Sequence, residues 1–311
     1  MLCSNIQTSS LTNKKKINSV TGGQILLRIV IGLMAIICAV PVLLIIIVAF
    51  SSEASIVENG FSFFPEAWSL EAFEYVAKFA DQIVHAYGVT IIETVFGSLL
   101  TVFITSMFAY VLSQQDFKVN KFLSKFVVFT TLFSGGMLGA YLINTNLYGL
   151  KNNIMVLVLP GCVTAWNTIV MRTFVRSNVP QSLIESAAID GAGEIYTFFR
   201  IVMPIMVAVM ASIGFMSAVG HWNEWQTAYI YLDDPNLSTL QLVLIKIEKD
   251  IDFLRRNTGS LTAEDILSLR DAPSESARMA ILFFAIAPIM VAYPFFQKYF
   301  IKGITVGSVK G

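Results

Sequence analysis

Residues 179–206 read VPQSLIESAAIDGAGEIYTFFRIVMPIM and hold the most informative pattern in the chain. Pro180 suits the first turn of a helix, and good helix formers follow it. Gly191 and Gly193 then break this helix, because glycine enters left-handed backbone at little steric cost. A second helix is expected to begin near Glu194. The stretch therefore predicts a helix, a sharp turn and another helix that leads directly into an apolar segment.

The chain around this stretch is strongly apolar. Of its 311 residues, 55% are hydrophobic and only 14% are charged, and the mean hydropathy is +0.69. A soluble domain usually carries about a quarter charged residues, so the composition disfavours a cytosolic enzyme and is typical of a membrane protein. The formal net charge is zero and gives no indication of nucleic-acid binding.

Cysteine and histidine usage excludes two further classes of site. Cys3, Cys38 and Cys162 show no CxxC spacing, and two of them lie in apolar runs. His85 and His221, the two histidines, are far apart in the chain. We therefore expect neither a disulfide framework nor a metal site built on cysteine or histidine.

Six stretches have the roughly 20 apolar residues that a helix needs to cross a bilayer. They are 26–50, 87–112, 126–144, 153–173, 203–221 and 278–297. The first is too long for a signal-peptide core and lacks a small-residue cleavage site, so we expect an uncleaved span. The predicted organisation is a polar tail over 1–25, a six-span membrane domain over 26–300 and a second tail over 301–311.

The distribution of basic residues predicts the orientation. With the N-terminus inside, the cytosolic pieces hold 13 of the 21 basic residues and four acids, whereas the outer pieces hold eight basic residues and 16 acids. An excess of Lys and Arg marks the cytosolic side, so both termini are expected in the cytosol. The loop 174–202 then lies in the cytosol, and the long segments 52–86 and 222–277 lie outside.

The predicted loop helix has two physical interpretations. Ala187, Ala188 and Gly191 leave little side-chain bulk, so the groove of another protein could approach the backbone closely. An amphipathic helix that rests on lipid headgroups is an equally good reading of the same residues.

A family resemblance favours the first interpretation. Glu185-Ser186-Ala187, three residues, Gly191, nine residues and then Ile201-Val202-Met203-Pro204 resemble the EAA loop of ABC importer permeases. Ser186 stands where the family pattern has alanine, and Met203 where it has leucine. Similarity to the carbohydrate-uptake branch of the family extends over Ile189–Ala192, Phe133–Gly136, Leu159–Gly161, His221–Trp225 and Tyr293–Phe300.

The resemblance implies an all-α membrane protein with six transmembrane helices, the type I ABC importer permease fold, in a bacterial cytoplasmic membrane. It further implies a heterodimer with a second homologous permease, two copies of a cytosolic P-loop ATPase, and a solute-binding protein outside that delivers an oligosaccharide. The residues implied in the ATPase contact are Glu185, Ser186, Ala187, Ala188, Asp190 and Gly191.

The chain has no nucleotide-binding motif of its own. No GxxxxGK[ST] sequence occurs in it, so nothing can hold phosphates as a P-loop does. We therefore expect a transport subunit that is not an enzyme and binds no cofactor, while ATP and Mg²⁺ are bound by the partner ATPase.

Two groups of residues are candidates for the substrate pathway. Glu93 is the one acid inside an expected span, and a carboxylate in lipid is costly. It either lines the sugar route or pairs with a Thr, Asn or Tyr of a neighbouring helix. Just beyond the fifth span, aromatic and polar side chains suited to sugars occur at Trp222, Asn223, Glu224 and Trp225. An interfacial aromatic belt, or a contact with the binding protein, is the interpretation we favour for them.

Two other classes of function fit less well. A self-contained channel or secondary transporter usually has several ionisable residues inside the membrane, and only Glu93 is present. An intramembrane enzyme needs a nucleophile beside a base, but the chain has no GxSxG motif and both histidines lie near the outer ends of the spans.

Overall fold

The computed structural model describes residues 22–114, 116–256 and 275–308, and within these ranges the protein is built from helices. The β-type pairing found there is an isolated bridge between Ser51 and Trp68. The α-helices are α1 (Gly22–Ala49), α2 (Glu53–Asn59), α3 (Glu71–Ala77), α4 (Ala80–Ser113), α5 (Asn120–Leu132), α6 (Gly136–Leu142), α7 (Met155–Val158), α8 (Ala165–Asn178), α9 (Gln181–Ile189), α10 (Glu194–Thr197), α11 (Met203–Trp222), α12 (Gln226–Tyr231), α13 (Leu240–Arg256) and α15 (Glu275–Ser308). Two π-helical segments, η1 (Ile143–Leu147) and η2 (Phe198–Val202), and the 3-10 helix η3 (Pro235–Leu237) complete the set.

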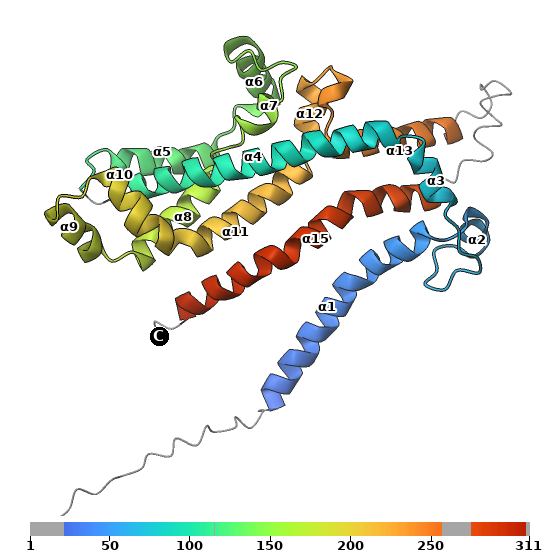
Figure 1. The fold of residues 1–311 in the computed structure, drawn as a ribbon, viewed down its shortest axis with the longest axis horizontal. Coiled ribbons are helices and arrows are strands. Elements are labelled where there is room, and N and C mark those ends of the chain that lie inside the picture. The colour runs from blue at the N-terminus through green and yellow to red at the C-terminus, as the bar shows by residue number, and fades with distance from the viewer. Residues whose placement is uncertain (1–21, 115, 257–274, 309–311) are drawn as a thin grey trace, which may run out of the picture.

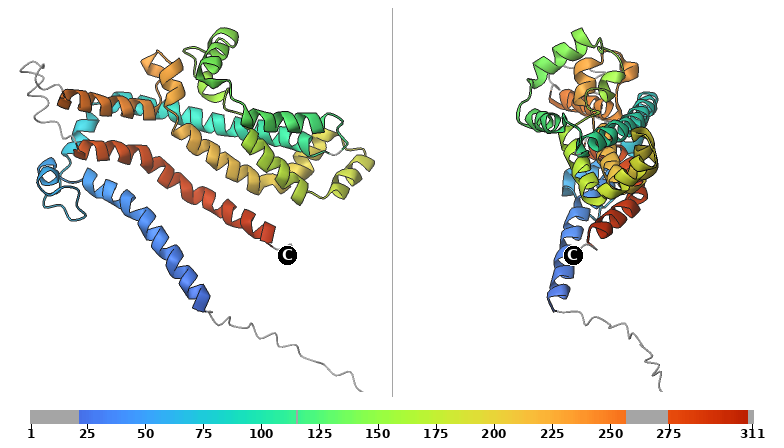
Figure 2. Two further views of the ribbon diagram at one scale, coloured as in Figure 1. Left: turned by 180° about the vertical axis from the view of Figure 1, so that it is seen from behind. Right: turned by 90° about the vertical axis from the view of Figure 1, so that its left-hand side faces the viewer.

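Figures 1 and 2 show an elongated bundle in which α4, α11 and α15 run along one another. The helices α6, α7 and α12 project from one side of α4, and α1 and α15 lie on the opposite side. We call the end that carries α9 and α10 the α9 end, and the end that carries α2, α3 and α13 the α13 end. A separate buried core fills each end.

The core at the α9 end joins α4, α8, η2 and α11. Its most deeply buried members are Ala109, Met171, Val175, Val202 and Met206, each with 2% or less of its surface exposed. The core at the α13 end joins α3, α4, α13 and α15, and includes Val76, Ile83, Leu240, Leu244 and Ile281. The long helix α4 contributes to both cores and connects them.

Four helical segments are long and apolar enough to cross a membrane by length and composition. They are Gly23–Ala49, Ala80–Ser113, Glu194–Trp222 and Glu275–Gln297. These segments overlap the first, second, fifth and sixth spans expected from the sequence almost completely. The helix of the sixth expected span is α15. It is longer than that span, because it continues to Ser308 and includes most of the expected tail 301–311.

The expected third span, 126–144, is not one continuous helix. Asn120–Leu132 and Gly136–Leu147 meet at an angle of 118° and count as a span only if the bent pair is taken together. The break has a local cause, since Gly136 adopts φ +72°, a conformation that residues with a Cβ rarely take. The pair Gly135-Gly136 therefore forms a sharp turn. From the sequence alone, the same pair could equally be a site of close helix packing.

The expected fourth span, 153–173, is also divided. After the four residues of α7, Pro160 and Gly161 stand in the break, and Thr164 starts α8 by accepting a hydrogen bond on its hydroxyl from the Asn167 amide (3.3 Å). The 14 residues of α8 extend about 21 Å at 1.5 Å per residue. This helix alone is shorter than the roughly 30 Å hydrocarbon core of a bilayer.

The first helix is attached to the rest of the protein at one end only. Over its most apolar stretch α1 buries none of its residues, and Figure 1 shows its first half pointing away from α15. Just after its other end, the Phe50 ring is tilted against that of Phe73 (ring centroids 4.6 Å apart) and meets Phe283 of α15 edge-on (6.4 Å). The exposed apolar surface of α1 fits contact with lipid rather than water.

Candidate functional site

The loop at the α9 end forms a tightly closed turn. Pro180 precedes α9 in an extended conformation. At the other end of α9, the Gly191 amide donates to the Ala188 carbonyl (3.1 Å) and the Ala192 amide to the Ala187 carbonyl (2.9 Å). This pair of bonds is a Schellman motif, which requires a left-handed residue between the helix and the next segment. Gly191 is that residue, with φ +81°.

The residues that the family resemblance assigns to an ATPase contact gather on this turn. Glu185, Ser186, Ala188, Asp190 and Gly191 are exposed. Ala187, by contrast, is only 7% exposed and packs within its own chain. Of the two alanines, Ala188 is therefore the one open to a partner. The Ser186 hydroxyl donates to the Ser182 carbonyl (2.8 Å), so a serine is accommodated on this helix without an unpaired polar group.

A hollow of about 600 Å³ lies along the turn between α9 and α10. Its lining residues are Leu183, Ser186, Ala187, Asp190, Gly191, Ala192, Gly193, Tyr196 and Ile201. Large apolar side chains close to it are exposed, with Ile189 at 87%, Ile195 at 73% and Tyr196 at 59%. A concave surface with an apolar rim at the end of a bundle has the form of a protein-docking site.

Specific contacts fix the α9 end to the bundle. The Tyr110 hydroxyl near the end of α4 donates to Glu194 Oε2 at the start of α10 (2.8 Å), and the Tyr110 ring lies 5.5 Å from that of Phe198. In the same region Arg172 Nε of α8 donates to the Leu112 carbonyl (2.9 Å). The α10 side of the loop is thus bonded directly to α4. Sequence reasoning missed this pairing, because 84 residues separate Tyr110 from Glu194 and no sequence pattern connects the two.

Glu93 has a partner within the chain that was not expected. It is 1% exposed, and its Oε1 lies 3.3 Å from Nδ1 of His221 on α11. The expected alternatives to a pathway role were Thr, Asn or Tyr partners. Gly97 makes room for the imidazole, since a Cβ at this position would lie 2.6 Å from His221 Nε2. Glu93 therefore points at α11 and joins it to α4.

Of the four candidates at the end of α11 and just after it, two are exposed and two are not. Trp222 is 6% exposed and belongs to the core of the α13 end. The Glu224 carboxylate accepts the Thr227 amide (2.7 Å) and so caps the start of α12. Asn223 is exposed, its side-chain amide donating to the Val219 carbonyl (2.8 Å), and Trp225 is 39% exposed. Trp222 and Glu224 thus have clear structural roles.

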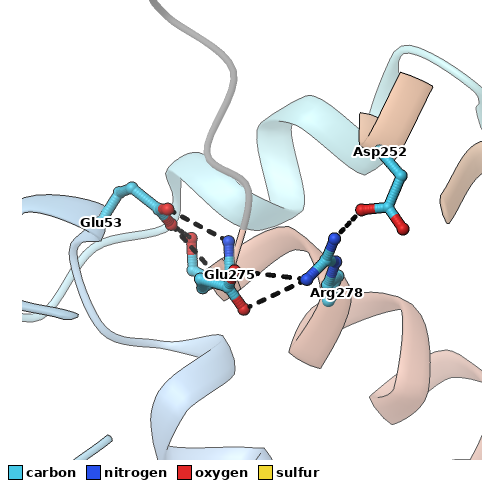
Figure 3. Close-up of polar contacts among 5 residues, drawn as sticks. Glu53, Asp252, Glu275 and Arg278 are labelled. Atoms are coloured by element: carbon cyan, nitrogen blue, oxygen red, sulfur yellow. Dashed lines mark hydrogen bonds and ion pairs between the residues drawn. The ribbon is translucent and has the colours of Figure 1, made fainter. Parts of the chain in front are cut away.

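A polar network ties three helices together at the α13 end (Figure 3). The Glu53 carboxylate of α2 accepts the backbone amides of Glu275 (3.1 Å) and Ser276 (3.0 Å) at the start of α15. Arg278 of α15 pairs with Glu275 (3.2 Å) and with Asp252 of α13. The network therefore links α13 to α15 on either side of residues 257–274.

Across 22–114, 116–256 and 275–308, no group of three or more His, Cys, Asp or Glu side chains is arranged to hold a metal ion. The described residues form a helical bundle with an exposed turn at one end.

Comparisons with known proteins agree with this picture. The model of the family described as binding-protein-dependent transport system inner membrane component matches residues 155–306. The polygalacturonan/rhamnogalacturonan transport system permease protein YtcP of Bacillus subtilis (strain 168) is 34% identical over 282 residues, which cover 89% of this chain and 94% of that protein. The chain belongs to this family.

Two further similarities extend the match. Protein LplC of the same Bacillus subtilis strain is 35% identical over 283 residues, covering 90% of this chain and 92% of that protein. Among solved structures, one described as a bacterial ABC transporter involved in the import of the acidic polysaccharide alginate has a similar chain. It superposes with a TM-score of 0.76 at 26% identity, covering 91% of this chain and 98% of that one. The protein is thus a permease component of an ABC transport system.

Proposed function

We propose that this permease is one of two homologous subunits that form the membrane pathway of a bacterial ATP-driven oligosaccharide importer. In this proposal the α9 turn docks on a separate cytosolic ATPase. The observation that carries it is the exposed turn itself. A short helix closed by a left-handed glycine lies at one end of the bundle, beside a hollow of about 600 Å³, in a member of this permease family.

The exposed groups of the turn have different roles in docking. The carboxylates of Glu185 and Asp190 offer acceptors to basic or amide groups of an ATPase groove. Ala188 lets the two surfaces approach closely, and Gly191 sets the direction in which the chain leaves α9. Since Glu194 is bonded to Tyr110, movement of the docked turn is passed directly to α4. This is a helix-in-groove contact, and ATP and Mg²⁺ would be held by the ATPase.

The orientation follows from the same assignment. The α9 end is placed in the cytosol and the α13 end outside, with six membrane passages, of which the third and fourth are broken helices. The excess of Lys and Arg in the pieces assigned to the cytosol supports this orientation. Both termini are then cytosolic, and the solute-binding protein approaches the α13 end, where Asn223 and Trp225 are exposed.

An oligosaccharide is the proposed cargo because sugar transport recurs among the relatives. One is the melibiose/raffinose/stachyose import permease protein MelC of Bacillus subtilis (strain 168), 30% identical over 230 residues. Another is the arabinooligosaccharides transport system permease protein AraQ of Halalkalibacterium halodurans, 26% identical over 290 residues.

A matched pair of glycine substitutions tests the docking role. Gly191→Ala places a Cβ on backbone with φ +81°, whereas Gly193→Ala makes the same change two residues later at φ −72°. Neither position has an atom within 4 Å of the added Cβ, so only backbone strain distinguishes the variants. In mild-detergent purification from the native membrane, we expect the wild type and Gly193→Ala to retain a second permease and a P-loop ATPase.

Gly191→Ala should lose most of the ATPase while it keeps the second permease. Equal ATPase recovery from the two variants would contradict the docking role of the turn. Purification of the wild-type chain alone, or with copies of itself, would favour a self-contained channel or secondary transporter instead.

A further inference from the structure

The last long helix, α15, contains a proline at a position where a neighbouring helix supplies the hydrogen bond that the proline removes. Pro288 lies inside α15 and has no backbone N–H, so the carbonyl of Phe284, four residues earlier, loses its usual helical partner. In a bilayer no water is at hand to replace that bond, and an unpaired carbonyl costs several kcal/mol. A neighbouring side chain is needed to satisfy it.

Tyr87 of α4 meets this need. Its hydroxyl donates to the Phe284 carbonyl at 2.6 Å. From α11, Trp222 Nε1 donates to the next carbonyl, that of Ala285, at 2.9 Å. The two rings lie beside each other, with centroids 6.0 Å apart. Side chains from two helices thus bond to successive carbonyls of a third helix directly before its proline.

Pro288 also divides α15 into two parts with different surroundings. Before it, Ala277, Ala280 and Ile281 are buried in the core of the α13 end, with 4% exposure or less. After it, Val291 and Phe295 are 67% and 65% exposed. We call these parts the fixed arm (275–287) and the free arm (288–297).

Space is available beside the free arm. A largely apolar cavity of about 420 Å³ separates part of it from α4 and α11, and Pro288, Ile289, Ala292 and Phe296 contribute to its lining. Trp222 borders the same cavity. On the α11 side the Phe215 ring lies 5.9 Å from that of Tyr293 and 5.1 Å from that of Phe296, and Ile289 packs against the core of the α13 end. A shift of the free arm beyond Ile289 would exchange the Phe215 contacts and leave the core around the fixed arm in place.

We propose that Tyr87 and Trp222 are positioning residues that hold the break at Pro288, so that the fixed arm stays with α4 and α11 while transport moves the free arm. The movement of the free arm during transport rests on the proposed importer function. The holding contacts do not depend on it and can be tested without nucleotide.

Distances between spin labels on the assembled transporter in lipid test the proposal. A common label replaces Val84 on α4, and the second label replaces either Leu282 in the fixed arm or Val291 in the free arm; all three positions are exposed. The native cysteines Cys3, Cys38 and Cys162 are first changed to serine. With ATP, Mg²⁺ and vanadate we expect the distance to Val291 to change and the distance to Leu282 to stay constant.

The holding contacts are then tested without nucleotide. Tyr87→Phe removes only the hydroxyl. The fraction of molecules whose label-to-label distance lies outside the main Val84–Leu282 peak should rise by about five-fold, as expected for one net hydrogen bond. Pro288→Ala restores a backbone N–H for Phe284, so the double variant Tyr87→Phe/Pro288→Ala should return to the wild-type distribution. A residue needed only for packing would not be rescued in this way.

Two control variants make the same chemical changes at other positions, both of them on α15. Tyr293→Phe should leave the distribution unchanged, and Pro294→Ala should not rescue Tyr87→Phe. Additive effects of Tyr87→Phe and Pro288→Ala, or equal movement of both arms with nucleotide, would overturn the proposal. If neither label pair responds to nucleotide while the rescue still occurs, the ATP-driven importer function and the arm movement are wrong and the holding contacts stand.

Discussion

The two ends of the bundle are built in different ways. At the α9 end, the proposed docking surface comes from one short stretch, and its turn is closed by bonds between residues three to five positions apart, such as Ala192 to Ala187. At the α13 end, stability comes from contacts between distant parts of the chain. Thr90 accepts the Leu240 amide (2.8 Å), 150 residues away, and Glu53 accepts the Ser276 amide (3.0 Å), 223 residues away.

The difference fits the two tasks proposed for the ends. A docking element must present its side chains to another protein, so few of its contacts are with its own bundle. The α13 end must hold α2, α3, α13 and α15 in one arrangement, and long-range contacts do this. Substitutions at the α9 end should therefore change assembly and coupling, whereas substitutions at or near the α13 end should change stability.

The largest stability change is expected from the buried pair that joins α4 to α11. Glu93→Ala leaves His221 beside an empty space, and the lost hydrogen bond and cavity should lower stability by about 2–3 kcal/mol. Glu93→Gln keeps a hydrogen-bonding side chain of the same size and should cost less. Thermal unfolding of the detergent-solubilised protein measures both. Equal unfolding temperatures for Glu93→Ala and wild type would show that the pair does not hold the helices together.

A smaller effect, of a different kind, is expected at the α9 end. Tyr110→Phe removes the bond to Glu194 and should cost about 1.5 kcal/mol, the lower end of the range for a hydrogen bond to a charged group, because Glu194 is exposed. Because α10 is then less tightly fixed to α4, ATP hydrolysis by the assembled transporter should become less dependent on the binding protein. Unchanged dependence, with a lowered unfolding temperature, would restrict Tyr110 to a structural role and weaken the contrast between the ends.

The smallest effect is expected where an ion pair lies in solvent. Lys151 and Asp233 are 3.1 Å apart, with side chains 50% and 70% exposed, and exposed pairs contribute little. Asp233 raises the pKa of Lys151 through a hydrogen bond and its charge. Any stability from the pair is therefore present at neutral pH and is lost only as the pH rises through that raised pKa. Lys151→Ala should leave the unfolding temperature at pH 7 unchanged within error, and a clear decrease would contradict this.

The sequence was informative where structure depends on neighbours in the chain. The order of helix, left-handed glycine and second helix around Gly191 was predicted, because proline and glycine act locally. Four of the six expected spans also correspond to long apolar helices among the described residues.

Sequence patterns failed where a local break or a distant partner decides the structure. Hydropathy cannot show that Gly136 turns the chain by a positive φ, so the sequence predicts one span over 126–144. The roles of Glu93 and Trp222 depend on His221 and on the Ala285 carbonyl, which only the packed structure brings to them. Trp222 is buried in the core of the α13 end, a structural role that its sequence position does not indicate.

The central claim is that the α9 turn, and not the α13 end, contacts the ATPase. The most direct test is photo-cross-linking in native membranes from a single cysteine carrying a photoreactive probe. The probe is placed at Ala188 on α9 or at Val57 on α2, which is 74% exposed. We expect an adduct with a P-loop ATPase from position 188 and none from position 57. An ATPase adduct from position 57, or none from position 188 in a complex that contains the ATPase, would contradict the central claim.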